Sequence, residues 1–262
     1  MSGPTGTGDD HAPQGAAGGP VPASAGGVRS VRVYLLVGFL LVCTGVFCAL
    51  GVWQIQRRAW KLDLIARVDQ RVHAAPVSPP GPADWPVITA AKHEYLAVRA
   101  TGRFLSDREV LVQAVTDLGG GYWVLAPFRT SDGFTVFVNR GFVPVDRRDP
   151  ASRRAGQAEG EATITGLLRL SEPGGGFLRS NDPAGDRWYS RDVPAMAAAR
   201  GLGDVAPYFI DADATPVPGG FPVGGLTVVR FPNSHLVYAL TWFSLCAMAL
   251  GGAVLVWRRS AR

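Results

Sequence analysis

Two long, uninterrupted apolar stretches dominate the pattern of hydrophobic and polar residues along the chain. Residues 33–53 and 236–257 contain no charged side chain. An α-helix rises ~1.5 Å per residue, so each stretch forms a helix about as long as the hydrocarbon core of a bilayer is thick. The pattern predicts a membrane protein with two transmembrane helices, at residues 31–56 and 233–257, flanking one folded domain at residues 57–232.

The charges beside the second stretch set the expected orientation. Three arginines follow it, from Arg258 on, against Arg230 before it, and positive residues favour the cytoplasmic side. The charges around the first stretch favour the opposite orientation, but long domains translocate largely regardless of charge. Because two spans place both termini on one side, we expect cytoplasmic tails at residues 1–30 and 258–262 and an extracytoplasmic domain.

The N-terminal region is expected to remain attached and partly disordered. The first apolar stretch is too long for the apolar part of a signal peptide, and no A-x-A cleavage site follows it. Residues 1–30 are rich in Gly, Pro, Ala and Ser, a composition that cannot bury enough surface to fold, so they predict a disordered tail. After the first span, apolar residues at helical spacing predict that the helix continues to about Arg71.

Between the spans, the pattern is that of a mainly antiparallel β domain with little helix, an α+β fold. Runs rich in β-branched and aromatic residues predict strands at 95–104, 109–115, 122–128, 134–139, 161–170 and 207–211. Asp192 as an N-cap and Gly201 as a stop predict a short helix between them. Prolines at 76–86 predict an extended linker, and 147–160 and 215–225 are expected to be loops.

Charge and cysteine content exclude several function classes. The net charge is +5, but no basic helix or recognised motif accompanies it, so nucleic-acid binding is not expected. All three cysteines lie in the apolar stretches, so the domain has no disulfide, no thiol nucleophile and no cysteine site for copper. The chain also lacks the common hydrolase, metalloprotease and nucleotide-binding motifs, so we do not expect an enzyme.

His235, where the second span begins, is the first candidate for chemistry. On a helix it shares a face with Tyr238, and an ionisable group at membrane depth usually faces protein, water or a ligand. Where the first span ends, Trp53, Arg57 and Lys61 share a helical face. A haem would suit this set, with His235 as ligand to the iron and Trp53 as a packing wall. Partners for the propionates would come from Arg57, Arg58, Lys61 or Arg230, with Arg57 and Lys61 as the main candidates.

A simpler interpretation stays open for the same residues. His235 would then be hydrogen-bonded to Gln54 or to a backbone carbonyl, and the tryptophans and arginines would anchor the helices at lipid headgroups. The spans are also expected to contact a partner protein within the bilayer, where small residues allow close helix approach; these are Gly45, Ala49, Ala247 and Gly251.

Two polar pairs in the domain also admit two interpretations each. Asn139 and Arg140 are expected to end a strand and cap the next turn, although Arg140 is also a candidate to meet a partner protein or a haem carboxylate. Asp211 and Asp213 are expected to mark a strand end, with cation binding as the alternative.

Four segments, in order, resemble the surfeit locus protein 1 family of membrane-anchored assembly factors for cytochrome c oxidase. They are Gly51-Val52-Trp53-Gln54 with Arg57 and Trp60-Lys61-Leu62; 121–128 leading to 138–144; Trp188 with Asp192 and Met196-Ala197; and Asn233, His235, Tyr238, Ala239 and 241–243. The resemblance runs from about Gly51 to Trp257, and Phe142 stands where the family commonly has tryptophan.

This resemblance implies a specific role. It implies two spans, a domain on the outer face of a bacterial plasma membrane, and help in haem a delivery to the catalytic subunit of a haem a–copper oxidase. Expected partners are that subunit, the lipid bilayer and the enzymes of haem a synthesis. His235 becomes the candidate ligand of haem a iron. The alternatives are an assembly scaffold that never binds haem, and a membrane-tethered enzyme or sensor.

Overall fold

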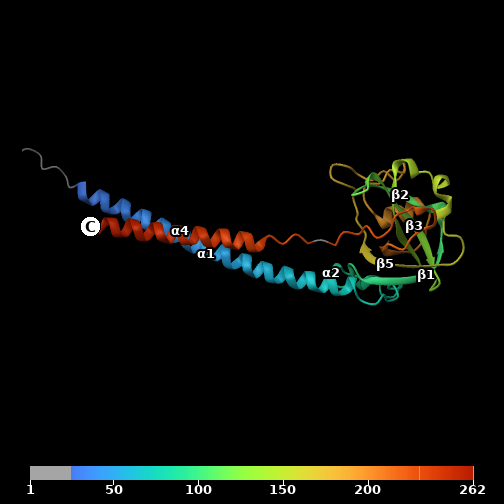
Figure 1. Ribbon diagram of the computed structural model, residues 1–262, viewed down its shortest axis with the longest axis horizontal. Helices are drawn as coiled ribbons and strands as arrows, with labels where there is room; N and C mark the ends of the chain where they lie inside the picture. Colours follow the sequence, from blue (N-terminus) through green and yellow to red (C-terminus); the bar gives the residue numbers. More distant parts are fainter. Residues whose placement is uncertain (1–24, 230, 262) are drawn as a thin grey trace, which may run out of the picture. The chain divides into compact units, whose positions relative to one another are not determined.

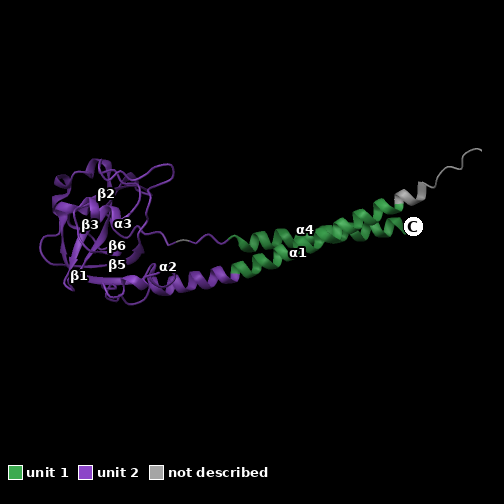
Figure 2. Cartoon of the chain, turned by 180° about the vertical axis from the view of Figure 1, so that it is seen from behind, with its two compact units in different colours: residues 1–58, 234–262 green, residues 59–233 purple. Residues whose placement is uncertain are grey.

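The computed structural model describes residues 25–229 and 231–261, which divide into two compact units. Unit 1 comprises residues 1–58 and 234–262, and unit 2 comprises residues 59–233 (Figure 2). The tail expected at residues 1–30 lies outside the described residues up to residue 24, and helix α1 already includes the rest of it.

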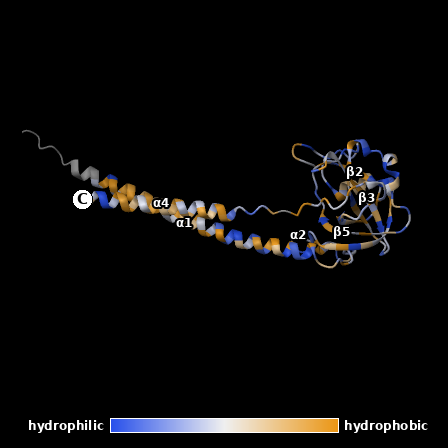
Figure 3. Ribbon diagram, in the orientation of Figure 1, coloured by the Kyte–Doolittle hydropathy of each residue, from blue (hydrophilic) through white to orange (hydrophobic). Residues whose placement is uncertain are grey.

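Unit 1 is an antiparallel pair of helices, formed by α4 (His235–Ser260) and the part of α1 (Ala25–Val72) that belongs to this unit (Figure 1). Both helices are long and apolar enough to cross a membrane, which indicates membrane association. Figure 3 shows hydrophobic residues along α4 and along the part of α1 beside it. Helix α1 ends one residue beyond the predicted Arg71, because its helical spacing of apolar residues continues past the span.

Aromatic contacts and one close glycine contact pair the two helices. The rings of Phe47 and Trp242 stack with centroids 5.8 Å apart. A Cβ added at Gly51 would lie 2.6 Å from the ring of Phe243, so this glycine permits the close approach. The four small residues predicted to allow close helix approach to a partner are all exposed in this helix pair: Gly45, Ala49, Ala247 and Gly251. The small residues of α4 that are buried are Ala239, Ala249 and Ala253.

Unit 2 is built on one six-stranded sheet. Its strands are β1 (Ala97–Phe104), β2 (Val110–Thr116), β3 (Gly119–Thr130), β4 (Thr135–Pro144), β5 (Ala162–Leu170) and β6 (Val205–Ala212). The order is β1-β5-β6-β4-β3-β2, and the end of β3 also pairs with β1, for example Thr130 with Gly102. Five strands therefore close into a ring. All pairs are antiparallel except β4–β6, which confirms a mainly antiparallel β domain.

The ring encloses one hydrophobic cluster and carries another on its outside. The inner cluster takes residues from all five strands of the ring: Val98, Phe128, Val138, Leu168 and Ile210, among others. The outer cluster includes Phe137, Trp188 and Phe209 and is covered by α3 (Val193–Ala199). Because alternate residues of a strand face opposite ways, Phe137 and Val138 on β4 belong to different clusters.

Short helices connect the strands. Helix α3 begins as predicted, because the Asp192 carboxylate accepts a hydrogen bond from the Ala195 N–H at 3.2 Å. The remaining short elements are α2 (Ala90–His93) and the 3₁₀ turns η1 (Trp85–Val87), η2 (Ser106–Arg108), η3 (Val145–Arg147), η4 (Pro150–Gly156) and η5 (Pro218–Gly220). The expected loops at 147–160 and 215–225 thus contain 3₁₀ turns.

The proline-rich segment after α1 packs on the domain instead of forming a free linker. The carbonyl oxygen of Pro80 accepts hydrogen bonds from Nε1 of Trp85 at 3.2 Å and from the Tyr208 hydroxyl at 2.7 Å. Val77 forms a parallel bridge with Val98 of β1. A proline has no N–H to donate to a neighbouring strand, so prolines are disfavoured inside a sheet but accepted in a segment such as this one.

Candidate functional site

His235, the first residue of α4, hydrogen-bonds to α1. Its Nδ1 lies 2.8 Å from Oε1 of Gln54, and Gln54 is only 9% exposed. An amide oxygen can only accept, so Nδ1 is the nitrogen that donates. In the neutral imidazole the lone pair then lies on Nε2, which is the nitrogen available to a metal or a second donor.

This contact matches the simpler interpretation of the sequence and also suits ligation. A histidine that binds a metal usually donates its other ring N–H to a fixed acceptor, which sets the tautomer and the ring orientation. Gln54 supplies that acceptor from a buried position on the facing helix. The geometry therefore orients Nδ1 of His235 and leaves Nε2 without a hydrogen-bond partner among the residues that the structure describes.

The other predicted site residues lie on the same two helices. Trp53 and Tyr238 are 52% and 55% exposed, on α1 and α4 respectively. Arg57 is exposed and Lys61 half-buried, one and two turns beyond Gln54 along α1. The structure brings His235 against Gln54, whereas Trp53 is about half exposed.

One buried polar atom lies next to this helix start. Oδ1 of Asn233, two residues before His235 in the chain, is buried and accepts no hydrogen bond from the residues that the structure describes. A buried acceptor without a donor costs free energy, so such an atom marks a place where a donor from a partner or ligand would be favourable.

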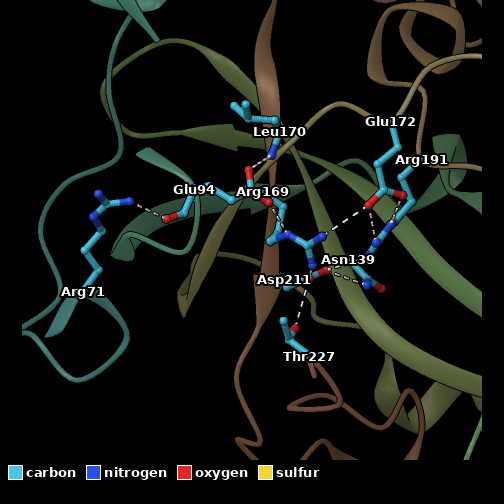
Figure 4. Close-up of polar contacts among 9 residues, drawn as sticks. All are labelled: Arg71, Glu94, Asn139, Arg169, Leu170, Glu172, Arg191, Asp211 and Thr227. Carbon is cyan, nitrogen blue, oxygen red and sulfur yellow. Dashed lines mark hydrogen bonds and ion pairs between the residues drawn. The ribbon is translucent and has the colours of Figure 1, made fainter. Parts of the chain in front are cut away.

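A second polar cluster, centred on Asp211 of β6, lies in unit 2 (Figure 4). Asp211 is 3% exposed. Its Oδ1 accepts from Nδ2 of Asn139 at 2.8 Å, and its Oδ2 accepts from the hydroxyl of Thr227 at 2.9 Å. Two arginines complete its coordination, with Nη1 of Arg169 at 3.1 Å and Nη1 of Arg191 at 3.4 Å. Asp211 is therefore the counter-ion of guanidinium groups and not a metal ligand.

The same arginines pair with two glutamates. Nε of Arg169 donates to Glu94 at 2.7 Å, and Nε of Arg191 donates to Glu172 at 2.9 Å. Burial alone would lower the pKa of Arg169, but attraction to Asp211 and the bond to Glu94 outweigh it, so its pKa is raised. Each charge in this cluster has a partner, which is the condition under which buried ions are tolerated.

The cluster also fastens both ends of the domain. Arg71, at the end of α1, donates to the backbone oxygen of Glu94 at 3.2 Å, and Thr227 belongs to the segment that leads out of the domain. Tyr95 adjoins them with a φ of 62°, a strained value for a tyrosine, and its ring lies 4.9 Å from the Arg169 guanidinium. These contacts hold the segments that lead into and out of the β domain against its sheet.

Sequence reasoning missed most of this cluster. Arg169 carries a local signal, because it interrupts the apolar residues of β5 between Leu168 and Leu170. Arg191 carries none, since its partners Glu172 and Asp211 lie 19 and 20 positions away. Glu172 also pairs with Arg169, three positions before it, a spacing that sequence reasoning did not use. Among the described residues, no group of three or more His, Cys, Asp or Glu side chains is placed to hold a metal ion.

Comparison with known proteins identifies related sequences. Residues 41–247 match the family described as the SURF1 family. Surfeit locus protein 1 of Mus musculus is 40% identical over 225 residues, covering 80% of this chain and 71% of the relative. The Homo sapiens protein of that name is 38% identical over 247 residues, covering 87% and 80%. A SURF1-like protein of Monosiga brevicollis is 39% identical over 235 residues, covering 84% and 87%.

Proposed function

This chain belongs to the SURF1 family, and from that membership we propose that it is an assembly factor for a haem a–copper cytochrome c oxidase. In this role it helps to mature the catalytic subunit and turns over no substrate. The support is the family resemblance over both helices and the domain, together with a helix pair that presents an oriented histidine.

The proposed location is a bacterial plasma membrane, with both termini cytoplasmic and unit 2 outside. The apolar character and antiparallel pairing of α1 and α4 support two spans. The arginines that follow α4 support a cytoplasmic C-terminus. Interfacial tryptophan and arginine residues, such as Trp53 and Arg57, are typical of the place where a span leaves the bilayer.

Haem a is the proposed cargo, held at His235. Haem supplies an iron with an axial position that an imidazole can fill. Gln54 would hold Nδ1 so that Nε2 is the ligating atom, as the 2.8 Å hydrogen bond supports. Arg57 and Lys61 would pair with the propionates, while the exposed rings of Trp53 and Tyr238 would contact the macrocycle. The oriented histidine is the observation that carries this proposal.

A second candidate, a scaffold that does not bind haem, draws on the same hydrogen bond. The contact between His235 and Gln54 joins α1 to α4, so His235 has a structural role even without a ligand. The scaffold would bind the oxidase intermediate through its helices and the β domain.

Purification of the full chain separates the two candidates. The tagged protein is extracted from membranes of cells that make haem a, and its haem is quantified by absorption after extraction into pyridine. His235→Ala is compared with His73→Ala, which changes an exposed histidine. The delivery role predicts haem in the wild type and the control but not in His235→Ala. Haem-free wild type that still co-purifies with the catalytic subunit would favour the scaffold.

A further inference from the structure

A pocket lies at one end of the ring of strands in unit 2. Its volume is about 480 Å³, within the range of small-molecule sites. Its apolar wall continues the inner hydrophobic cluster, because Phe104, Val138, Ile164 and Ala212 belong to both. The segments around Gln157 and Val217 form the rest of the wall. The pocket is thus the open mouth of a small barrel, a common place for a ligand.

Arg140 of β4 lies in this wall and is buried. It was expected at a strand end, but it sits inside β4 and is 7% exposed. Its Nη2 donates to the Gly156 carbonyl at 2.5 Å, and its Nη1 lies 3.4 Å from Oε1 of Gln157. The guanidinium also stacks 4.8 Å from the Phe104 ring centroid. A guanidinium has five N–H donors, so much of its hydrogen-bonding capacity is unused by these contacts.

No carboxylate lies within ion-pair distance of Arg140 among the described residues. Two other arginines differ: the buried Arg153 pairs with Glu109, and the partly buried Arg169 pairs with Asp211. Burial lowers the pKa of Arg140, and the positive charge of Arg153 offsets part of the distant attraction of Glu109. A buried charge without a counter-ion is costly, so an anion in the pocket would be favourable.

We propose that this pocket binds a carboxylate carried on an apolar body, with Arg140 as the partner of the carboxylate. The apolar wall would take a chain of the fatty-acid class. Glu159 and Asp213 also line the pocket, and Asp213 already accepts from the Thr215 N–H at 3.0 Å. Their negative charge favours a monoanion over a phosphate dianion. This site is in unit 2 and does not depend on the proposed haem ligand His235.

The test measures binding of decanoate to the full chain in lipid nanodiscs, with empty nanodiscs as the reference for partition into lipid. Decylamine and decyl phosphate carry the same tail with a cation and a dianion. The proposal predicts saturable binding of decanoate that is stronger than that of decyl phosphate, and no saturable binding of decylamine. Carbon NMR of decanoate labelled at the carboxyl carbon gives the pKa of the bound carboxyl. We expect it to lie roughly one to three units below the pKa of the free acid, the shift that a nearby arginine causes.

Three variants make the site specific. Arg140→Gln removes the charge but keeps donors for the Gly156 carbonyl, and Ala162→Phe fills the pocket mouth. Arg154→Gln removes an exposed charge nearby and is the control. We expect Arg140→Gln to weaken binding about tenfold or more and Ala162→Phe to abolish it, with Arg154→Gln unchanged. Should Arg140→Gln fail to fold, Ala162→Phe decides. The proposal would be overturned if decanoate did not bind saturably to the wild type, or if it bound to Ala162→Phe as well as to the wild type.

Discussion

Nδ1 of His235, at the start of α4, lies 2.8 Å from Oε1 of Gln54 on α1. The bond joins the two apolar helices at one end of their antiparallel pairing, and stacking of Phe47 on Trp242 continues the contact along them. It also leaves Nε2 of the imidazole as the atom with a free lone pair. One interaction thus sets both the packing of the helix pair and the chemistry of its histidine.

Loss of the Gln54 acceptor should weaken haem binding even though His235 remains. Gln54→Leu removes the oxygen that orients the imidazole, and loss of such a supporting contact typically costs 10–100-fold in affinity, a range we expect here as an order of magnitude. Titration of haem into the purified chain, followed by its absorption, measures the effect. Gln56→Leu, at an exposed position on the same helix, is the control. Equal affinity in both variants would contradict the orienting role.

Neutralising Asp211 should destabilise the β domain. Arg169 and Arg191 are partly buried and share Asp211 as a counter-ion, which Asp211→Asn removes. Breaking a buried ion pair costs about 3–5 kcal/mol. Denaturant unfolding followed by tryptophan fluorescence measures the loss. Asp213→Asn, where the half-buried carboxylate accepts only from the Thr215 N–H, should change the free energy of unfolding by less than about 1 kcal/mol. Similar losses in the two variants would rule out a special role for the cluster.

Adjacent glycines of β3 should differ sharply in their tolerance of a methyl group. A Cβ added at Gly121 would lie 2.2 Å from the Val143 carbonyl oxygen, whereas one added at Gly120 has no neighbour within 4 Å. Because the neighbour of Gly121 is backbone, the sheet must shift, and we expect Gly121→Ala to lower the free energy of unfolding by about 1–3 kcal/mol. Gly120→Ala should stay within about 0.5 kcal/mol of the wild type. Thermal or denaturant unfolding of both variants compares them directly.

Tyr208 should make the domain less stable at alkaline pH. Burial, followed by the nearby charge of Asp84, raises the pKa of its hydroxyl, which donates to the Pro80 carbonyl at 2.7 Å. In the unfolded chain a tyrosine ionises near pH ~10, so above that pH the unfolded state loses its proton first and the free energy of unfolding falls. Below pH ~10 both states keep the proton and this contribution does not vary.

The Tyr208→Phe variant isolates this effect. It should lose about 1 kcal/mol at pH 8, from the missing hydrogen bond. Its stability should then fall less steeply than that of the wild type above pH ~10. Denaturant unfolding at several pH values gives both quantities, with Tyr122→Phe as the control. Parallel stability curves for Tyr208→Phe and the wild type would exclude Tyr208 as the source of the alkaline slope.

Local patterns predicted most of the elements but few of their partners. Uncharged apolar runs identified both long helices, runs rich in β-branched and aromatic residues identified the strands, and Asp192 identified the start of α3, because each signal lies within a few neighbouring residues. One partner of Arg169 is Glu94, 75 positions away, and the fold of the domain brings them together. A contact between residues so far apart in the sequence cannot be predicted from the residues around either one.

The end of β4 was predicted too early. Asn139 and Arg140 were expected to end a strand, yet β4 continues to Pro144. Gly141, inside β4, has a φ of 125°, and a Cβ there would lie 2.1 Å from the Val223 carbonyl oxygen. A close approach to a distant loop, and not a turn, explains that glycine. The close contact of Gly51 with Phe243 was also not predicted, because which face of α1 meets α4 depends on the partner helix.

The most direct test of the central claim is a reduced-minus-oxidised optical spectrum of membranes from cells with and without this gene. Oxidase assembly predicts that deletion selectively removes the haem a band, that the b- and c-type bands remain, and that the wild-type gene restores the lost band. An unchanged haem a band with normal oxidase activity in the deleted strain would contradict the proposed function.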